Sequence, residues 1–82
     1  MNQKIVCRLE KLDHLIGSSL TGTPDELSQK LQISRRTLFE YLTLLNKLGA
    51  VIHYDKAAKT YHYKKKGFFR FRFTPEHETH EL

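Results

Sequence analysis

Two helix start signals stand close together in the segment "TPDELSQKLQISRRTLFEYLTLLNKLG", residues 23–49. Thr23 is a good N-cap, Pro24 suits the first helical position, and Glu26 completes a capping box. Ser34 is a second N-cap and follows the first helix after a short turn. Gly49 can adopt the left-handed conformation that ends helices. A short helix, a tight turn and a longer helix together predict a helix-turn-helix.

The longer helix divides into two faces when its residues are placed at 100° intervals. One face is apolar and is expected to be buried: Leu38, Tyr41, Leu42, Leu45 and Leu48. The opposite face is polar: Arg36, Glu40, Thr43 and Lys47. Arg35, Thr37 and Phe39 flank the polar face. Two arginines therefore occupy the first turn, on the side that faces away from the core.

The remaining segments predict one further helix and several strands. An apolar stripe indicates an amphipathic helix over residues 3–17: Ile5, Leu9, Leu12 and Ile16. Residues 51–54 and 60–64, around "DKAAK", predict a hairpin, and "GFFRFRFT" alternates as a further strand. The expected fold class is α+β, a winged helix-turn-helix of three helices, a hairpin wing and an extra C-terminal strand. We expect residues 1–74 to form this domain and residues 75–82 a flexible tail.

The positive charge of the chain is concentrated in one region. The formal net charge is +5, yet residues 34–72 hold ten Lys and Arg against two acidic residues. Residues 1–33 hold equal numbers of basic and acidic side chains. Such asymmetry indicates a polyanionic partner, although a basic face kept for solubility gives the same composition.

The segment from Thr23 to Tyr63 resembles the N-terminal DNA-binding domain of WYL-type and DeoR-type bacterial transcriptional regulators. The matching residues include the capping box, the second helix start and the strand that follows: Thr23, Glu26, Leu27, Leu31, Ile33, Ser34, Arg36, Thr37, Leu38, Leu42, Gly49, Ile52, Tyr54, Asp55 and Tyr61. The resemblance covers about residues 5–64. Glu40 and Tyr41 depart from it, because those regulators commonly carry Arg and Asp there.

The resemblance implies sequence-specific binding to double-stranded DNA by a bacterial transcriptional regulator, here expected without an effector domain. It places five residues at the start of the longer helix near DNA: Ser34, Arg35, Arg36, Thr37 and Phe39. It also implies that Lys56 and Lys59 in the wing contact the sugar-phosphate backbone of the DNA. The exposed face adds further candidate contacts: Glu40, Thr43 and Lys47. Either arginine can read guanine or bind a phosphate, and the sequence does not assign these roles. Arg36 points more directly outward, whereas Arg35 lies closer to the flank, where a phosphate contact is favoured. Phe39 can contact a thymine methyl group or extend the hydrophobic core. Glu40 can accept a hydrogen bond from cytosine N4 or form an ion pair with Arg36 one turn earlier.

Other chemistry has weaker support. We do not expect the protein to be an enzyme, because the sequence places no general base beside a nucleophilic side chain and contains no glycine-rich phosphate-binding loop. His77 and His80 lack zinc-protease spacing, and His53 and His62 are expected to be cross-strand neighbours that pack or lie exposed. We therefore expect no metal, cofactor or small-molecule ligand. The single Cys7 is expected to be a half-buried structural thiol.

The chain is expected to be cytoplasmic, because it has no apolar run that could span a membrane and no signal peptide. A homodimer is expected, since such regulators read two half-sites, and the apolar face of "GFFRFRF" is its candidate interface. The competing interpretation of that segment is a strand packed onto the first helix. The alternative function is a winged-helix protein-interaction module that does not contact DNA.

Overall fold

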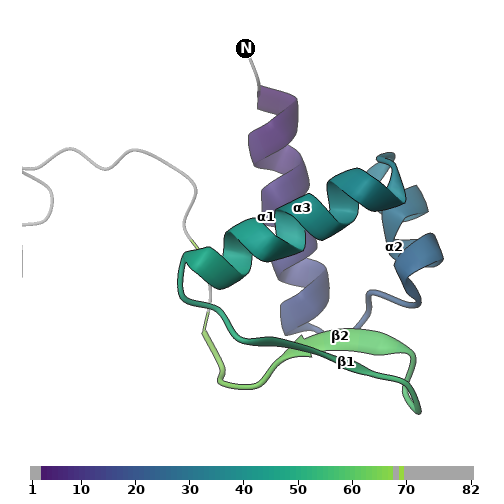
Figure 1. The fold of residues 1–82 in the computed structure, drawn as a ribbon, viewed down its shortest axis with the longest axis vertical. Coiled ribbons are helices and arrows are strands. Elements are labelled where there is room, and N and C mark those ends of the chain that lie inside the picture. The colour runs from purple at the N-terminus through teal and green to yellow at the C-terminus, as the bar shows by residue number, and fades with distance from the viewer. Residues whose placement is uncertain (1–2, 68, 70–82) are drawn as a thin grey trace, which may run out of the picture.

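The computed structural model describes residues 3–67 and 69, and it contains three helices followed by a two-stranded antiparallel sheet (Figure 1). The helices are α1 (Gln3–Gly17), α2 (Pro24–Leu31) and α3 (Arg35–Lys47), and the strands are β1 (Ile52–Asp55) and β2 (Thr60–Tyr63). The α+β class, the three helices and the hairpin are therefore confirmed. No helix within these residues is both long enough and apolar enough to cross a lipid bilayer.

One hydrophobic core joins all three helices to the hairpin. Its buried side chains come from α1, α2, α3 and β2: Leu9, Leu12, Ile16, Leu27, Leu31, Leu38, Leu42, Leu45 and Tyr61. Each helix contributes residues spaced three or four apart, which fall on one face. The core therefore fixes which face of α3 remains exposed.

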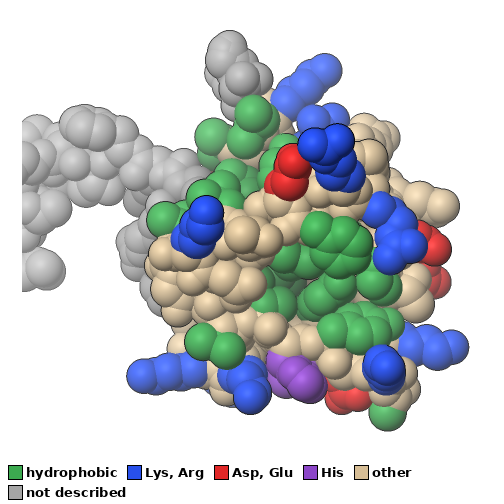
Figure 2. All heavy atoms as spheres, viewed as in Figure 1, with side chains coloured by type: hydrophobic (Ala, Val, Ile, Leu, Met, Phe, Trp, Pro, Cys, Tyr) green, Lys and Arg blue, Asp and Glu red, His purple; other side chains and the backbone are tan. Residues whose placement is uncertain are grey.

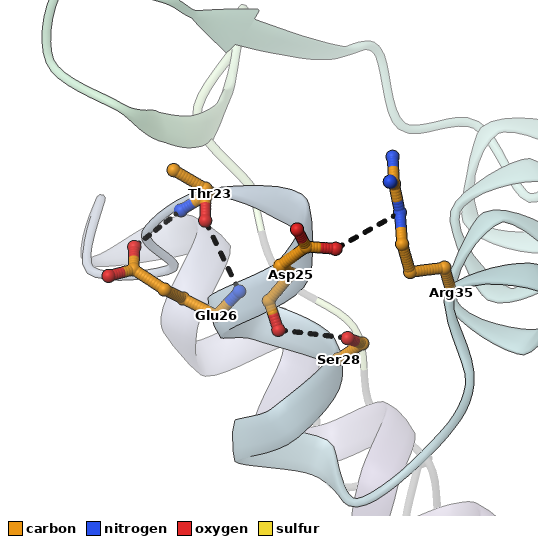
Figure 3. Close-up of polar contacts among 5 residues, drawn as sticks. All are labelled: Thr23, Asp25, Glu26, Ser28 and Arg35. Carbon is orange, nitrogen blue, oxygen red and sulfur yellow. Dashed lines mark hydrogen bonds and ion pairs between the residues drawn. The ribbon is translucent and has the colours of Figure 1, made fainter.

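Both predicted N-caps are present. Thr23 Oγ1 accepts the Glu26 N–H at 3.2 Å, and Glu26 Oε1 accepts the Thr23 N–H at 2.8 Å (Figure 3). Ser34 Oγ accepts the Thr37 N–H at 3.0 Å. These bonds satisfy N–H groups that have no partner inside the helix. They confirm where α2 and α3 begin.

The turn between α2 and α3 depends on a left-handed residue that is not glycine. Gln32 has φ 57° and caps α2, with its N–H donating to Gln29 O at 3.1 Å. The Ile33 N–H then returns to Ser28 O at 3.0 Å. This pair of bonds closes the turn in the way common at helix C-termini. At the other end of α3, Gly49 has a positive φ, as predicted.

The hairpin brings the two histidines opposite each other, as expected from the sequence, with β1 one residue further along than predicted. His53 pairs with His62 and Tyr54 with Tyr61. The Asp55 carboxylate accepts the N–H groups of Ala57 and Ala58 at 2.9 and 3.1 Å, which stabilises the turn. The hairpin tip therefore carries Lys56 and Lys59 on an ordered turn.

Two residues of the apolar helix stripes, Leu48 and Ile5, are exposed, and the prediction of a half-buried Cys7 is wrong. Leu48 is 56% exposed, because α3 ends at Lys47 and Leu48 serves as its C-cap rather than continuing the buried face. Ile5 is 41% exposed, since the core packs against the later turns of α1. Cys7 is exposed rather than half-buried.

Phe69 is described, and it is not part of a strand. Its ring lies 6.4 Å from that of Tyr63, and its N–H donates to Asp13 Oδ2 on α1 at 3.4 Å. Phe69 therefore packs against the core. Gly67 is also described and is not in a strand, whereas residues 68 and 70–82, which hold the rest of the predicted extra strand and the predicted tail, lie outside the described residues.

Candidate nucleic-acid interface

The first turn of α3 is held in place by two hydroxyl groups. Ser34 Oγ accepts the Thr37 N–H and donates to Thr37 Oγ1 at 3.1 Å. Thr37 is half-buried by this contact, whereas Ser34 is exposed. Because the helix start is fixed, the directions of Arg35 and Arg36 are fixed with it.

Arg35 is restrained by two neighbours. Its Nε lies 3.3 Å from Asp25 Oδ1 at the start of α2 (Figure 3), and its guanidinium carbon lies 5.5 Å from the centre of the Phe39 ring. A cation above an aromatic face is attracted by the ring quadrupole. Arg35 is thus oriented before any partner binds, at the cost of sharing its charge with Asp25.

Arg36 points into solvent. Its side chain is 88% exposed, and its Nε lies 3.6 Å from Glu40 Oε2 one turn later. Exposed ion pairs of this kind are worth about 0.3–0.5 kcal/mol. The surface pair that the sequence suggested for Glu40 is therefore present, and it is weak enough for an anion or a base edge to displace.

The outer face of α3 forms a shallow depression. Its lining contains five of the predicted site residues and Leu44: Arg36, Phe39, Glu40, Thr43, Leu44 and Lys47. Phe39 is 42% exposed and is not part of the buried core. Its ring is therefore accessible to a partner, as contact with a thymine methyl would require.

The wing places basic side chains beside this face. Lys56 and Lys59 are exposed at the hairpin tip, and Lys64, Lys65 and Lys66 are exposed after β2. Figure 2 shows Lys and Arg side chains around the edge of the face and hydrophobic side chains gathered between α3 and the hairpin. A basic edge around an accessible surface suits a polyanion.

The capping box also affects the charge of Glu26. Hydrogen bonds from the backbone and side chain of Thr23 lower the pKa of Glu26, and the charges of Lys30 and Lys59 lower it further. The carboxylate form that completes the cap at the start of α2 is therefore favoured.

A second basic surface was missed by sequence reasoning. Lys4, Arg8, Lys11 and Lys30 line a groove between α1 and α2 that also reaches Gln32, in the turn before α3. Lys30 Nζ donates to the carbonyl groups of Leu20 and Thr21, and Lys11 Nζ donates to Lys30 O. Residues 1–33 appear neutral in sequence because their acidic side chains are equally numerous. Lys4, Arg8 and Lys11 are spaced four and three residues apart, which places them on one face of a helix. This spacing is the signal that could have revealed a basic surface in a segment with no net charge.

One basic surface, the groove between α1 and α2, reaches Gln32 in the turn before α3, and the other is carried by the wing. The structure thus brings Ser34, Arg35, Arg36, Thr37 and Phe39 together at one end of α3. Glu40, Thr43 and Lys47 continue along its outer face, and Lys56 and Lys59 lie on the wing. Comparisons with protein-family models, with curated proteins and with solved structures find no match to this chain.

Proposed function

We propose that this protein binds double-stranded DNA, with the N-terminal half of α3 in the major groove. The observation that carries the proposal is the pair Arg35 and Arg36 at the exposed start of the second helix of a helix-turn-helix. A basic groove between α1 and α2 and the exposed lysines of the wing add to it. In DNA-binding versions of this motif, that end of the helix contacts base edges.

Arg36 and Arg35 have different roles in this proposal. Arg36 is exposed and weakly paired, so its guanidinium reads guanine O6 and N7. Arg35 is oriented by Asp25 and Phe39 and binds a backbone phosphate, which sets the register of the helix. Phe39 contacts a thymine methyl at the same end of α3.

The lysines supply affinity rather than sequence preference. Lys56 and Lys59 at the wing tip contact phosphates on one side of the recognition helix. Lys4 and Arg8 contact phosphates on the other side, in the groove between α1 and α2. Contacts of this kind fix the protein on the duplex without reading bases.

The biological role we propose is that of a transcriptional regulator in a bacterial cytoplasm, with DNA as its partner and no catalytic activity. The support is the resemblance of Thr23, Ser34, Arg36 and Thr37 to WYL-type and DeoR-type regulators. The regular placement of these residues at the start of α2 and α3 agrees with that resemblance.

A homodimer is part of the same proposal. One helix-turn-helix reads few base pairs, and two copies read a site with two-fold symmetry. Exposed apolar side chains lie at the end of α3 and directly after it, at Leu44, Leu48 and Val51. Such side chains favour a protein contact.

The same apolar side chains favour a second candidate function, a protein-interaction module without DNA contact. The two functions differ in the residues on which they depend, although Leu44 also lines the depression on the outer face of α3. A module of that kind would use Leu44, Leu48 and Val51, and substitutions of Arg35 and Arg36 would leave its partner bound.

Selection of bound sequences from a random duplex pool tests the proposal. An enriched sequence with two-fold symmetry would support specific binding by a dimer. A pool that remains random after repeated selection would contradict sequence-specific binding. The Arg36→Ala variant is the matched control, because it should lose the preference for guanine.

A further inference from the structure

Two histidines lie opposite each other on the two strands of the wing. His53 in β1 and His62 in β2 are directly paired in the sheet register. Their ring centres lie 5.3 Å apart, with the ring planes inclined at 70°. His53 is exposed and His62 is half-buried, so both rings are open to small solutes. The core, the capping network and the proposed DNA contacts use neither ring.

The position of His62 determines which of its nitrogens is free. Its Nδ1 lies 3.3 Å from the carbonyl oxygen of Tyr63. A carbonyl only accepts hydrogen bonds, so this contact needs a proton on Nδ1 and leaves the lone pair of a neutral ring on Nε2. A backbone carbonyl that holds one ring nitrogen is a common partner of metal-ligating histidines, and it fixes both the tautomer and the ring direction.

The separation of the two rings suits a shared metal ion. A zinc–imidazole bond is about 2.0–2.1 Å long, which places the metal roughly 3.2 Å from each ring centre along the nitrogen lone pair. At a tetrahedral angle, the two ring centres would then lie about 5.2 Å apart. The observed separation is 5.3 Å. The shared site requires that the exposed His53 ring rotate so that one nitrogen is directed toward the same point as Nε2 of His62.

We propose that His53 and His62 form a two-histidine site for a divalent transition metal on the wing. Imidazole nitrogen suits Cu²⁺, Ni²⁺ and Zn²⁺, with Cu²⁺ bound most tightly, whereas Mg²⁺ and Ca²⁺ prefer oxygen ligands. Within residues 3–67 and 69, no group of three or more His, Cys, Asp or Glu side chains is arranged around a metal. Water molecules complete the coordination, and the site is correspondingly weaker than a structural zinc site.

Metal binding at this position would act on the wing itself. The two ligands come from different strands, so the pair is assembled only when the hairpin is folded. A ligand that binds the folded form more tightly stabilises it by mass action. The ion would also add positive charge to a hairpin that already carries Lys56 and Lys59.

The test uses the untagged full chain with His77→Ala and His80→Ala, because the sequence places these two histidines three residues apart and they could bind metal independently. Calorimetric titration with Cu²⁺ should show one ion per chain. His53→Ala and His62→Ala, each added singly, should weaken binding by about a hundredfold, since the second ligand of a pair binds intramolecularly. The matched control is His14→Ala on α1, which should leave the affinity unchanged.

A spectroscopic measurement locates the ion and checks that each variant is folded. Substoichiometric Cu²⁺ should broaden the amide resonances of β1 and β2 selectively, and the loss of either wing histidine should abolish this broadening while the other resonances stay dispersed. Unchanged affinity in the folded His53→Ala or His62→Ala chain would overturn the proposal. Broadening centred on α1, or no detectable binding in the parent chain, would also overturn it.

Discussion

The side-chain hydroxyl of Thr21 accepts the backbone N–H of Tyr61 at 2.8 Å, linking the loop between α1 and α2 to strand β2. Thr21 is fully buried, and its own N–H donates to Thr60 Oγ1 at 3.2 Å. The two hydroxyl groups lie 3.1 Å apart. The wing is therefore attached to the helical part of the fold by side-chain hydrogen bonds as well as by the core contact of Tyr61.

Thr21→Val should destabilise the fold by about 1–3 kcal/mol, because the valine keeps the shape of the side chain but leaves the buried Tyr61 N–H without its acceptor. The change in unfolding free energy is measured by urea denaturation. Thr21→Ser retains the hydroxyl and is the matched control. If Thr21→Val were as stable as Thr21→Ser, the hydrogen bond to Tyr61 would contribute little to stability.

Tyr63→Phe should cost about 1.5 kcal/mol, since the Tyr63 hydroxyl donates to Asp13 Oδ1 at 2.5 Å and bonds to charged acceptors are the stronger ones. Burial raises the pKa of Tyr63 above its ordinary value of 10.0, and the bond to Asp13 raises it further. The neutral form is therefore favoured in the folded state. The stabilisation is complete below about pH 10 and decreases as the pH rises above that value.

Urea melts at several alkaline pH values test this dependence. The unfolding free energy of the parent chain should fall above about pH 10, and Tyr63→Phe should reduce the slope. A smaller slope should remain, because burial also raises the pKa of Tyr61. Identical alkaline profiles for the parent and Tyr63→Phe would contradict this account of the Tyr63 environment.

Thr23→Ala should destabilise the protein by about 1 kcal/mol through loss of the capping box. The same capping box makes the stability of the fold depend on pH in the acidic range, because its hydrogen bonds lower the pKa of Glu26 below 4.5. A lowered pKa in the folded state gives a contribution that is present above the unfolded value and lost as the pH falls through the folded one. Thermal melts should therefore show a weaker dependence on acid for Glu26→Gln. A Thr23→Ala melting temperature equal to that of the parent would contradict the role of this cap.

The elements of this fold could be predicted because local signals agree with the packing. The caps at Thr23 and Ser34 and the spacing of buried leucines are properties of neighbouring residues, and the structure confirms them. The hairpin itself and the pairing of His53 with His62 were also expected from sequence, but Asp55 belongs to β1 and pairs with Thr60 rather than lying in the turn.

The remaining features depend on contacts between residues far apart in the chain. Thr21 meets Tyr61, and Asp13 meets Tyr63, only after the helices and the hairpin have packed together. The basic groove between α1 and α2 depends in the same way on Lys30 lying beside the basic face of α1. Leu48 shows that a local pattern can also mislead. Its position in the helical repeat predicts burial, but α3 ends at Lys47 and Leu48 is exposed.

Asp25→Asn should strengthen DNA binding, because Asp25 now shares the charge of Arg35 and would lie near the phosphates in the proposed complex. We expect a gain of about threefold to tenfold at low salt, which should decrease as added salt screens the charge. Fluorescence anisotropy of a labelled duplex measures the change. Asp55→Asn, on the wing turn, is an informative comparison, since its charge does not pair with Arg35. Weaker binding by Asp25→Asn would indicate that the orientation of Arg35 matters more than its free charge.

The most direct test of DNA binding is the salt dependence of that anisotropy for the parent chain and for the double variant Arg35→Ala, Arg36→Ala. If about four phosphates are neutralised per chain, the logarithm of the binding constant should fall with the logarithm of salt concentration at a slope near −3.6. The double variant should bind more weakly at every salt concentration and with a shallower slope, while its melting temperature stays close to that of the parent. Absence of binding by the parent at low salt, or unchanged binding by the folded double variant, would contradict the proposal that the start of α3 contacts DNA.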